Sequence, residues 1–313
     1  MSSERTLRVA FLGAGNVVRS LLEYAPAHPF PLDLAVVGVL RRSGVWRGEQ
    51  RGSFDLDALD YDPSADPIEG ADLVIDALPS FYPDGEPATG LIQRALDAGI
   101  DVLTVNKGPL VAAYRDLHQR AHASGALFRF SIDGVFPAVN ISIRDLRGAT
   151  LTRVRAAANS TTNLILTEME RGRTFDDVLE QAVRMEIAEP DPAQDIDGID
   201  TAAKMVVMVN AATDSDFHLN DVRVQGIRDI DPTVAVRSGR SWRLVGNYDG
   251  YSIEVGPRLF GKDDPFYQIR GTEKIVEFQT IEMGSITIMG GMSGRMEMAA
   301  AIVRELLNMY VPF

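Results

Sequence analysis

Residues 7–18 limit most strongly what this chain can fold into, because an apolar strand, a glycine-rich turn and the start of a helix follow one another there. The run Leu-Arg-Val-Ala-Phe-Leu at 7–12 has the composition of a strand in a buried parallel sheet. Gly13 permits a tight turn, and Gly15 lets the backbone approach a pyrophosphate at the helix N-terminus. The third fingerprint position is Val18 instead of glycine, so the match is partial. This order predicts dinucleotide contacts at Gly13, Gly15, Asn16 and Val17.

Strands and helices alternate through the rest of the first 130 residues. Further strands are predicted at 34–40, 72–78, 101–105 and 128–132, with helices ending near residue 24 and spanning 86–98. This alternation predicts a Rossmann-type, doubly wound parallel sheet. Ligands of such sheets bind beyond the carboxyl ends of the strands. Ser80 and Asn106 are therefore candidate cofactor contacts, and Lys107 is a candidate catalytic residue.

Arg41 and Arg42 follow the second predicted strand, where NAD-binding proteins place an acidic residue on the ribose 2′-hydroxyl. A pair of guanidinium groups favours a 2′-phosphate, so the sequence predicts NADP, with NAD as the alternative. In the competing interpretation the two arginines are only exposed loop charges.

The second half of the chain has the pattern of an α+β domain. Strands are predicted at 151–158, 243–245, 252–255, 275–278 and 285–289, and helices after 159–163, at 174–185 and at 298–307. The junction Asn-Ser-Thr-Thr-Asn at 159–163 is either a helix cap or a polar cradle for a ligand. We expect a dinucleotide-binding domain at 1–130 and a substrate-binding and dimerisation domain at 131–294, with the closing helix at 295–313 returning to the first domain.

Residues 188–204 run from a proline-rich acidic loop into a helix. Asp200 and Lys204 are four residues apart and share one helix face. With the loop carboxylate Glu189, they form a group that suits a small substrate bearing an amine and a polar carbonyl. The alternative is a solvated acidic loop with a single i,i+4 ion pair.

Composition narrows the function further. A net charge of −13 argues against nucleic acid as a partner, because phosphates require a basic patch. The chain has no cysteine, which excludes disulfides and thiolate metal sites. No apolar run reaches the length of a membrane span, and the N-terminus lacks a signal-peptide core, so a cytoplasmic protein is expected.

Taken together, these residues resemble the homoserine dehydrogenase family along essentially the whole chain. The resemblance is carried by GAGNV, DGEPATGLIQRALDAGIDVLTVNKGPL, NSTTN, AEPDPAQDIDGIDTAAK and SITIMGGMSGRMEMAAAIVREL. It implies an NAD(P)-dependent oxidoreductase of amino-acid biosynthesis that interconverts L-aspartate 4-semialdehyde and L-homoserine in the aspartate pathway. It also implies a homodimer built by strands of the second domain.

The resemblance assigns roles by position. Lys107 and Lys204 correspond to the family's two active-site lysines, which we expect to face one cleft, and Glu189 and Asp200 to carboxylates that hold the substrate's amino group. Hydride transfer to an aldehyde builds negative charge on oxygen, which an ammonium group stabilises or protonates. The matching motifs add substrate contacts at Thr161 and Asp195 and a cofactor contact at Gly294.

Several positions depart from the family pattern, among them Arg129, Asp133, Ser160, Gln194 and the run at 185–187. Asp133 either faces the substrate or caps a helix near Pro137. No metal is predicted, since the changed region is where family members often bind a monovalent cation. The departures leave two alternatives: a related oxidoreductase for another small hydroxy or keto acid, and a catalytically idle nucleotide-binding homologue. The regulatory domain of many members does not follow the terminal helix, so feedback inhibition through it is not expected.

Overall fold

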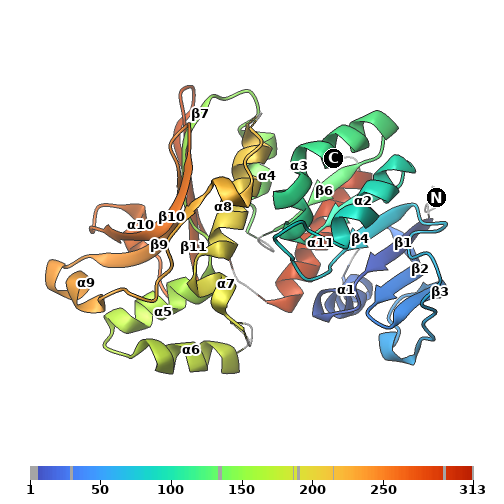
Figure 1. The fold of residues 1–313 in the computed structure, drawn as a ribbon, viewed down its shortest axis with the longest axis horizontal. Helices are drawn as coiled ribbons and strands as arrows, with labels where there is room; N and C mark the ends of the chain where they lie inside the picture. Colours follow the sequence, from blue (N-terminus) through green and yellow to red (C-terminus); the bar gives the residue numbers. More distant parts are fainter. Residues whose placement is uncertain are drawn as a thin grey trace. The chain divides into compact units, whose positions relative to one another are not determined.

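The computed structural model describes residues 6–28, 31–132, 136–185, 187–188, 191–213, 215–291 and 294–311 (Figure 1). The chain divides into two compact units, one formed by residues 1–135 with 294–313 and the other by residues 136–293. Among the described residues, no helix is both long and apolar enough to span a lipid bilayer.

The first unit contains a sheet with the strand order β3-β2-β1-β4-β5-β6. Its strands are β1 (Thr6–Leu12), β2 (Asp33–Arg41), β3 (Gly44–Arg51), β4 (Leu73–Asp76), β5 (Asp101–Thr104) and β6 (Phe128–Phe130). All neighbours pair in parallel except β2 and β3, which form an antiparallel hairpin. The predicted fold class is confirmed. Strand β3 is not predicted from the sequence, because GVWRGEQR is polar and has an exposed, irregular pattern.

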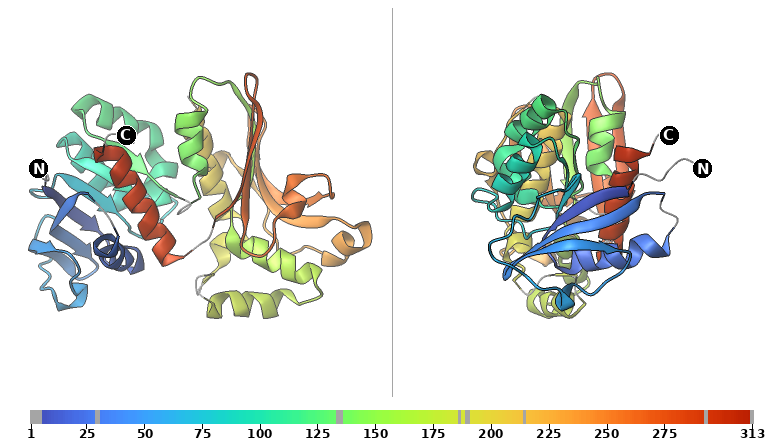
Figure 2. Two further views of the ribbon diagram at one scale, coloured as in Figure 1. Left: turned by 180° about the vertical axis from the view of Figure 1, so that it is seen from behind. Right: turned by 90° about the vertical axis from the view of Figure 1, so that its right-hand side faces the viewer.

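Helices cover both faces of this sheet (Figure 2). On one face, α1 (Asn16–Ala27) packs against α11 (Arg295–Tyr310), and on the other, α2 (Ala88–Asp97) packs against α3 (Lys107–Ser124). The apolar stripe of α1 explains its position, since Val18, Leu21 and Leu22 are buried against the sheet. A short 3₁₀ helix, η1 (Leu56–Ala58), lies between β3 and β4.

The second unit contains a mostly antiparallel sheet with the order β12-β11-β7-β9-β10-β8. Its strands are β7 (Leu151–Ala157), β8 (Arg223–Val224), β9 (Ser241–Tyr248), β10 (Ile253–Phe260), β11 (Lys274–Thr280) and β12 (Gly284–Gly290). Every strand predicted for this half is present. Only β8 runs parallel to its neighbour, β10.

Helix α8 (Ile199–Ala212) packs on one face of the second sheet, against β7, β9 and β10. Gly246 of β9 makes this close approach possible, because a Cβ atom there would lie 2.2 Å from Cγ of Met205. The other helices of this unit are α4 (Ala138–Asn140), the π-helical turn η2 (Ile141–Asp145), α5 (Ser160–Glu170), α6 (Phe175–Arg184), α7 (Ala193–Ile196), η3 (Leu219–Asp221), α9 (Pro232–Ser238) and α10 (Pro265–Gln268).

Candidate active site

The turn between β1 and α1 is shaped to admit a pyrophosphate. Gly13 has a φ of +108°, and a Cβ atom there would lie 2.8 Å from the Ala77 oxygen, so only glycine fits. Its amide donates to the Leu40 oxygen at 3.0 Å, and this hydrogen bond fixes the position of the turn between the ends of β2 and β4. Gly15 caps α1 without a side chain, and nothing lies within 4 Å of the Cβ position. The first amides of α1, where Asn16 and Val17 stand, therefore have room for an anion, and the residues fit a dinucleotide.

The end of β2 carries an ion-pair cluster that the sequence analysis did not foresee. Arg41 Nη1 lies 3.2 Å from Oδ1 of Asp57, and its guanidinium lies 4.8 Å from the ring centroid of Tyr61. Arg19, on α1, reaches the same carboxylate at 2.9 Å. Arg42 is exposed in the β2–β3 turn. Asp57 comes 16 residues after Arg41, beyond a hairpin, so no local pattern in the sequence connects the two.

The carboxyl ends of β4 and β5 bring Ser80, Asn106 and Lys107 together. The amide of Lys107 donates to Ser80 Oγ at 3.1 Å, and Asn106 caps α3 by accepting from the Gly108 amide at 2.9 Å. Lys107 is thus the first residue of a capped helix. Below this turn, Thr104 donates to the fully buried Asp76 at 2.8 Å. Burial raises the pKa of Asp76 to about 6, against the opposing effect of hydrogen bonds from Leu78 and Thr104.

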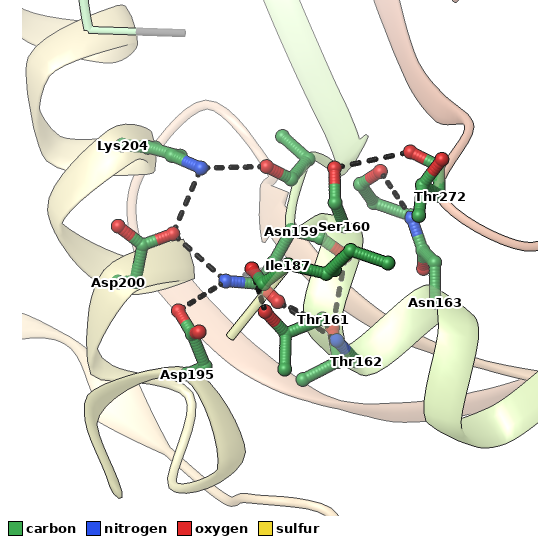
Figure 3. Close-up of polar contacts among 12 residues, drawn as sticks. Asn159, Ser160, Thr161, Thr162, Asn163, Ile187, Asp195, Asp200, Lys204 and Thr272 are labelled. Carbon is green, nitrogen blue, oxygen red and sulfur yellow. Dashed lines mark hydrogen bonds and ion pairs between the residues drawn. The ribbon is translucent and has the colours of Figure 1, made fainter. Parts of the chain in front are cut away.

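In the second unit, Asp200 and Lys204 form an ion pair at 2.8 Å across one turn of α8 (Figure 3). Both residues are 8% exposed, so the pair is buried and not part of a solvated acidic loop. Lys204 Nζ also donates to the Ala158 oxygen, at the end of β7, at 2.7 Å. A buried pair of this kind costs desolvation energy and adds little to stability, which makes a functional role the better explanation.

Asn159 connects this pair to the junction at 159–163. Its Oδ1 accepts from the Thr162 amide at 2.9 Å and so caps α5, while its Nδ2 donates to Asp195 at 2.7 Å and Asp200 at 2.9 Å (Figure 3). One side chain therefore caps α5 and also bonds two carboxylates, while the ligand cradle at this junction stays a prediction. Burial, and next the charge of Asp200, raise the pKa of Asp195. Asn159 is not among the site residues predicted from the sequence, although its position before Ser-Thr-Thr is a recognisable cap signal.

The remaining predicted residues are placed as follows. Thr161 is buried in the first turn of α5, and its hydroxyl donates to the Ile187 oxygen at 3.3 Å. Gly294 precedes the first residue of α11. Glu189 and Asp133 lie outside the described residues. Within the part of the chain that is described, no three His, Cys, Asp or Glu side chains are grouped to hold a metal ion.

Two departures from the family pattern have identifiable surroundings. Ser160 Oγ donates to the Thr272 oxygen at 3.0 Å, and so holds α5 to the segment before β11. Gln194 is exposed on α7.

Comparison with known proteins assigns the chain to a family. Residues 137–307 match the family model for homoserine dehydrogenase, and residues 13–131 match the model for the homoserine dehydrogenase NAD binding domain. The chain belongs to the homoserine dehydrogenase family. Members are NAD(P)-dependent oxidoreductases that act on a CH–OH group, so the predicted family, enzyme class and nucleotide cofactor are confirmed.

Individual relatives agree with this assignment. Homoserine dehydrogenase of Methanocaldococcus jannaschii is 34% identical over 88% of this chain and 83% of the relative. The NAD(+)-dependent homoserine dehydrogenase of Pseudomonas canavaninivorans is 32% identical over 77% of this chain and 71% of its own. A hyperthermophilic archaeal homoserine dehydrogenase solved in complex with NADPH shares the fold, with a TM-score of 0.83 and 24% identity over 98% of this chain and 99% of that one.

Proposed function

We propose that this homoserine dehydrogenase family member interconverts L-aspartate 4-semialdehyde and L-homoserine, with Lys204 as a catalytic ammonium group in the second unit. The group formed by Lys204, Asp200, Asn159 and Asp195, of which the first three are buried, carries the proposal. It sets two carboxylates and one ammonium group side by side, which suits a substrate that has both an α-amine and a reacting oxygen.

Each polar group has a distinct task in this proposal. Asp200 and Asp195 neutralise the substrate's α-ammonium, together with Glu189 by the family correspondence, while Asn159 holds the two aspartates in place. Lys204 stabilises the charge that develops on the substrate oxygen and exchanges its proton. Lys107 is the second catalytic lysine by the same correspondence, and the cap by Asn106 and the contact with Ser80 orient its backbone. Thr161 lines the substrate pocket at the start of α5.

The nicotinamide, when bound, supplies or accepts the hydride. We propose that Gly13, Gly15, Asn16 and Val17 hold the pyrophosphate, that Ser80, Asn106 and Gly294 contact the nucleotide, and that Arg41 and Arg42 attract the 2′-phosphate of NADP. The working form is proposed to be a homodimer that uses the strands of the second unit.

Turnover of L-homoserine and a panel of four- and five-carbon hydroxy acids, each with NADP and NAD, tests the substrate and the cofactor together. We expect homoserine to be the best substrate. Lys204→Met and Lys107→Met should each lower kcat/KM by roughly a hundredfold or more, with NADPH affinity unchanged by calorimetry. A higher kcat/KM for another hydroxy acid than for homoserine overturns the substrate assignment. Nucleotide binding without turnover of any compound supports a catalytically idle homologue.

A further inference from the structure

Lysine is rare in this chain, and its positions are informative. Of the 31 basic residues, 27 are arginines and only four are lysines: Lys107, Lys204, Lys262 and Lys274. Two of these are the proposed catalytic lysines, and Lys262 is exposed. The fourth, Lys274, is 4% exposed. Burying an ammonium group costs desolvation energy. Because this protein otherwise uses arginine, a buried lysine suggests a role that needs a compact ammonium group in place of a planar guanidinium.

Lys274 lies at the same end of the second sheet as Lys204. It is the first residue of β11, and the antiparallel pairing of Ile275 with Ala157 puts it beside Ala158, one residue further along β7. The oxygen of Ala158 is the atom to which Lys204 Nζ donates, at 2.7 Å. Two lysines from different elements therefore reach the end of one strand.

The side chain of Lys274 also points to the face of the sheet on which α8 packs. Residues alternate along a strand, so Lys274 shares its face with Val276, which pairs with Ala156. Ala156 pairs in turn with Gly246, the residue that leaves room for Met205 of α8. Lys274 Nζ lies 5.9 Å from the ring centroid of Phe136, just before α4, and α4 contacts α8.

The backbone around Lys274 is tied to the start of α5. Ser160 donates to the Thr272 oxygen, and Asn163 Nδ2 donates to the Glu273 oxygen at 2.7 Å. The segment that presents Lys274 is thus anchored by the same junction that holds Asp195 and Asp200 through Asn159. A preorganised ammonium group of this kind loses little conformational freedom when it binds an anion.

We propose that Lys274 binds the α-carboxylate of the amino-acid substrate, a role that rests on the proposed function. An α-amino acid carries an ammonium and a carboxylate, and Asp195 and Asp200 serve only the first. Lys204 is engaged by Asp200 and reserved for the reacting oxygen. With Lys274 added, the proposed site presents negative charge to the ammonium group of a zwitterion and positive charge to its carboxylate. Lys274 therefore selects amino acids over simple amino alcohols.

L-Homoserine and L-homoserinamide, which lacks only the carboxylate charge, form the test pair. The unmodified enzyme should prefer homoserine in kcat/KM. Lys274→Met should raise KM for homoserine at least about tenfold, change kcat less, and reduce the preference over the amide by a similar factor. Lys274→Arg, which keeps the charge, should retain part of the preference. Lys262→Met removes the exposed lysine and should change neither value.

Lys274→Gln provides a second neutral variant if the methionine variant does not fold, and NADPH affinity reports an intact first unit. A folded neutral variant that keeps the full preference for homoserine over the amide overturns the assignment. So does a fall in kcat with unchanged KM, because that would place Lys274 at the reacting oxygen. If the unmodified enzyme does not turn over homoserine, the proposed function itself is overturned. Results from the Lys274 variants alone bear only on the role of Lys274.

Discussion

At the nucleotide end of the first unit, the exposed carboxylate of Asp57 lies between the guanidinium groups of Arg19 and Arg41. These two arginines, Arg19 foremost, lower the pKa of Asp57, so it is ionised at neutral pH. In the proposed nucleotide site, this carboxylate would compete with a 2′-phosphate for both arginines and would accept a hydrogen bond from a free 2′-hydroxyl. Asp57→Asn should therefore shift the ratio of NADH to NADPH dissociation constants about tenfold in favour of NADPH, measured by calorimetry.

Asp60→Asn is the matched control, because it removes the same charge from an exposed residue three positions away. It should leave the ratio unchanged. Equal ratios in both variants would show that Asp57 has no part in the choice of nucleotide. The segment that carries Asp57 is held in place by buried Leu56 and by the Tyr61 hydroxyl, which donates to the Leu56 oxygen at 2.8 Å.

The buried carboxyl group of Asp76 should make the free energy of unfolding depend on pH. Its pKa rises from 3.8 to about 6 on folding, so the folded state binds the proton more tightly than the unfolded state. This contribution to stability is fully present below pH 3.8 and is lost as the pH rises to about 6, and it amounts to at most about 3 kcal/mol. Asp76→Asn should flatten the free energy of unfolding over that interval in urea titrations. If the free energy of unfolding varies with pH in the same way in the variant and the unmodified protein, the raised pKa of Asp76 is contradicted.

At the scale of elements, the start of α5 combines a helix cap with the proposed substrate site. Asn159→Ala removes a helix cap and the bonds that hold Asp195 and Asp200, whereas Thr174→Ala removes only the cap of α6, which accepts from the Asp177 amide. Each should lower the free energy of unfolding by about 1 kcal/mol or more. Only Asn159→Ala should also raise KM for homoserine, in steady-state assays. An equal KM in both variants would mean that Asn159 is a cap and nothing more.

Most elements could be predicted because their signals are local. The strands β1, β4, β5, β7 and β11 are short apolar or alternating runs, and α1, α2 and α6 have helical periodicity with glycine or threonine at an end. The helix α3 was also missed, although Asn106 caps it and Gly125 follows its last residue, and three further missed elements have weaker signals. Strand β3 is polar and exists by pairing with β2, and α9 and α10 are short helices that begin at proline after an aspartate cap.

At the scale of the whole molecule, the proposed homodimer can be tested on the face of the second sheet opposite α8. That face has a cavity of about 260 Å³ lined by Arg153, Arg155, Asn247 and Arg258, among others. Light scattering should give about twice the chain mass of 34.2 kDa. Arg258→Glu should shift the enzyme toward monomer, whereas the same reversal at exposed Arg237 on α9 should not. A monomeric unmodified enzyme, or dissociation by both variants, would argue against this interface.

The sequence by itself determined the local patterns: the strand, glycine turn and helix at 7–18, the i,i+4 pair of Asp200 and Lys204, and the family resemblance that joins them. These depend on residues close together in the chain, or on motifs that can each be recognised without the others. Predicted roles for Lys107, Lys204, Asp195 and the nucleotide contacts remain proposals.

Only the tertiary structure decided which distant groups meet. It buried the Asp200–Lys204 pair, set Asn159 between two aspartates 36 and 41 residues away, and placed Asp57 between Arg19 and Arg41. It also placed Lys274 beside the end of β7. Burial and long-range contact arise when strands pair and helices pack, and no window of local sequence contains that information.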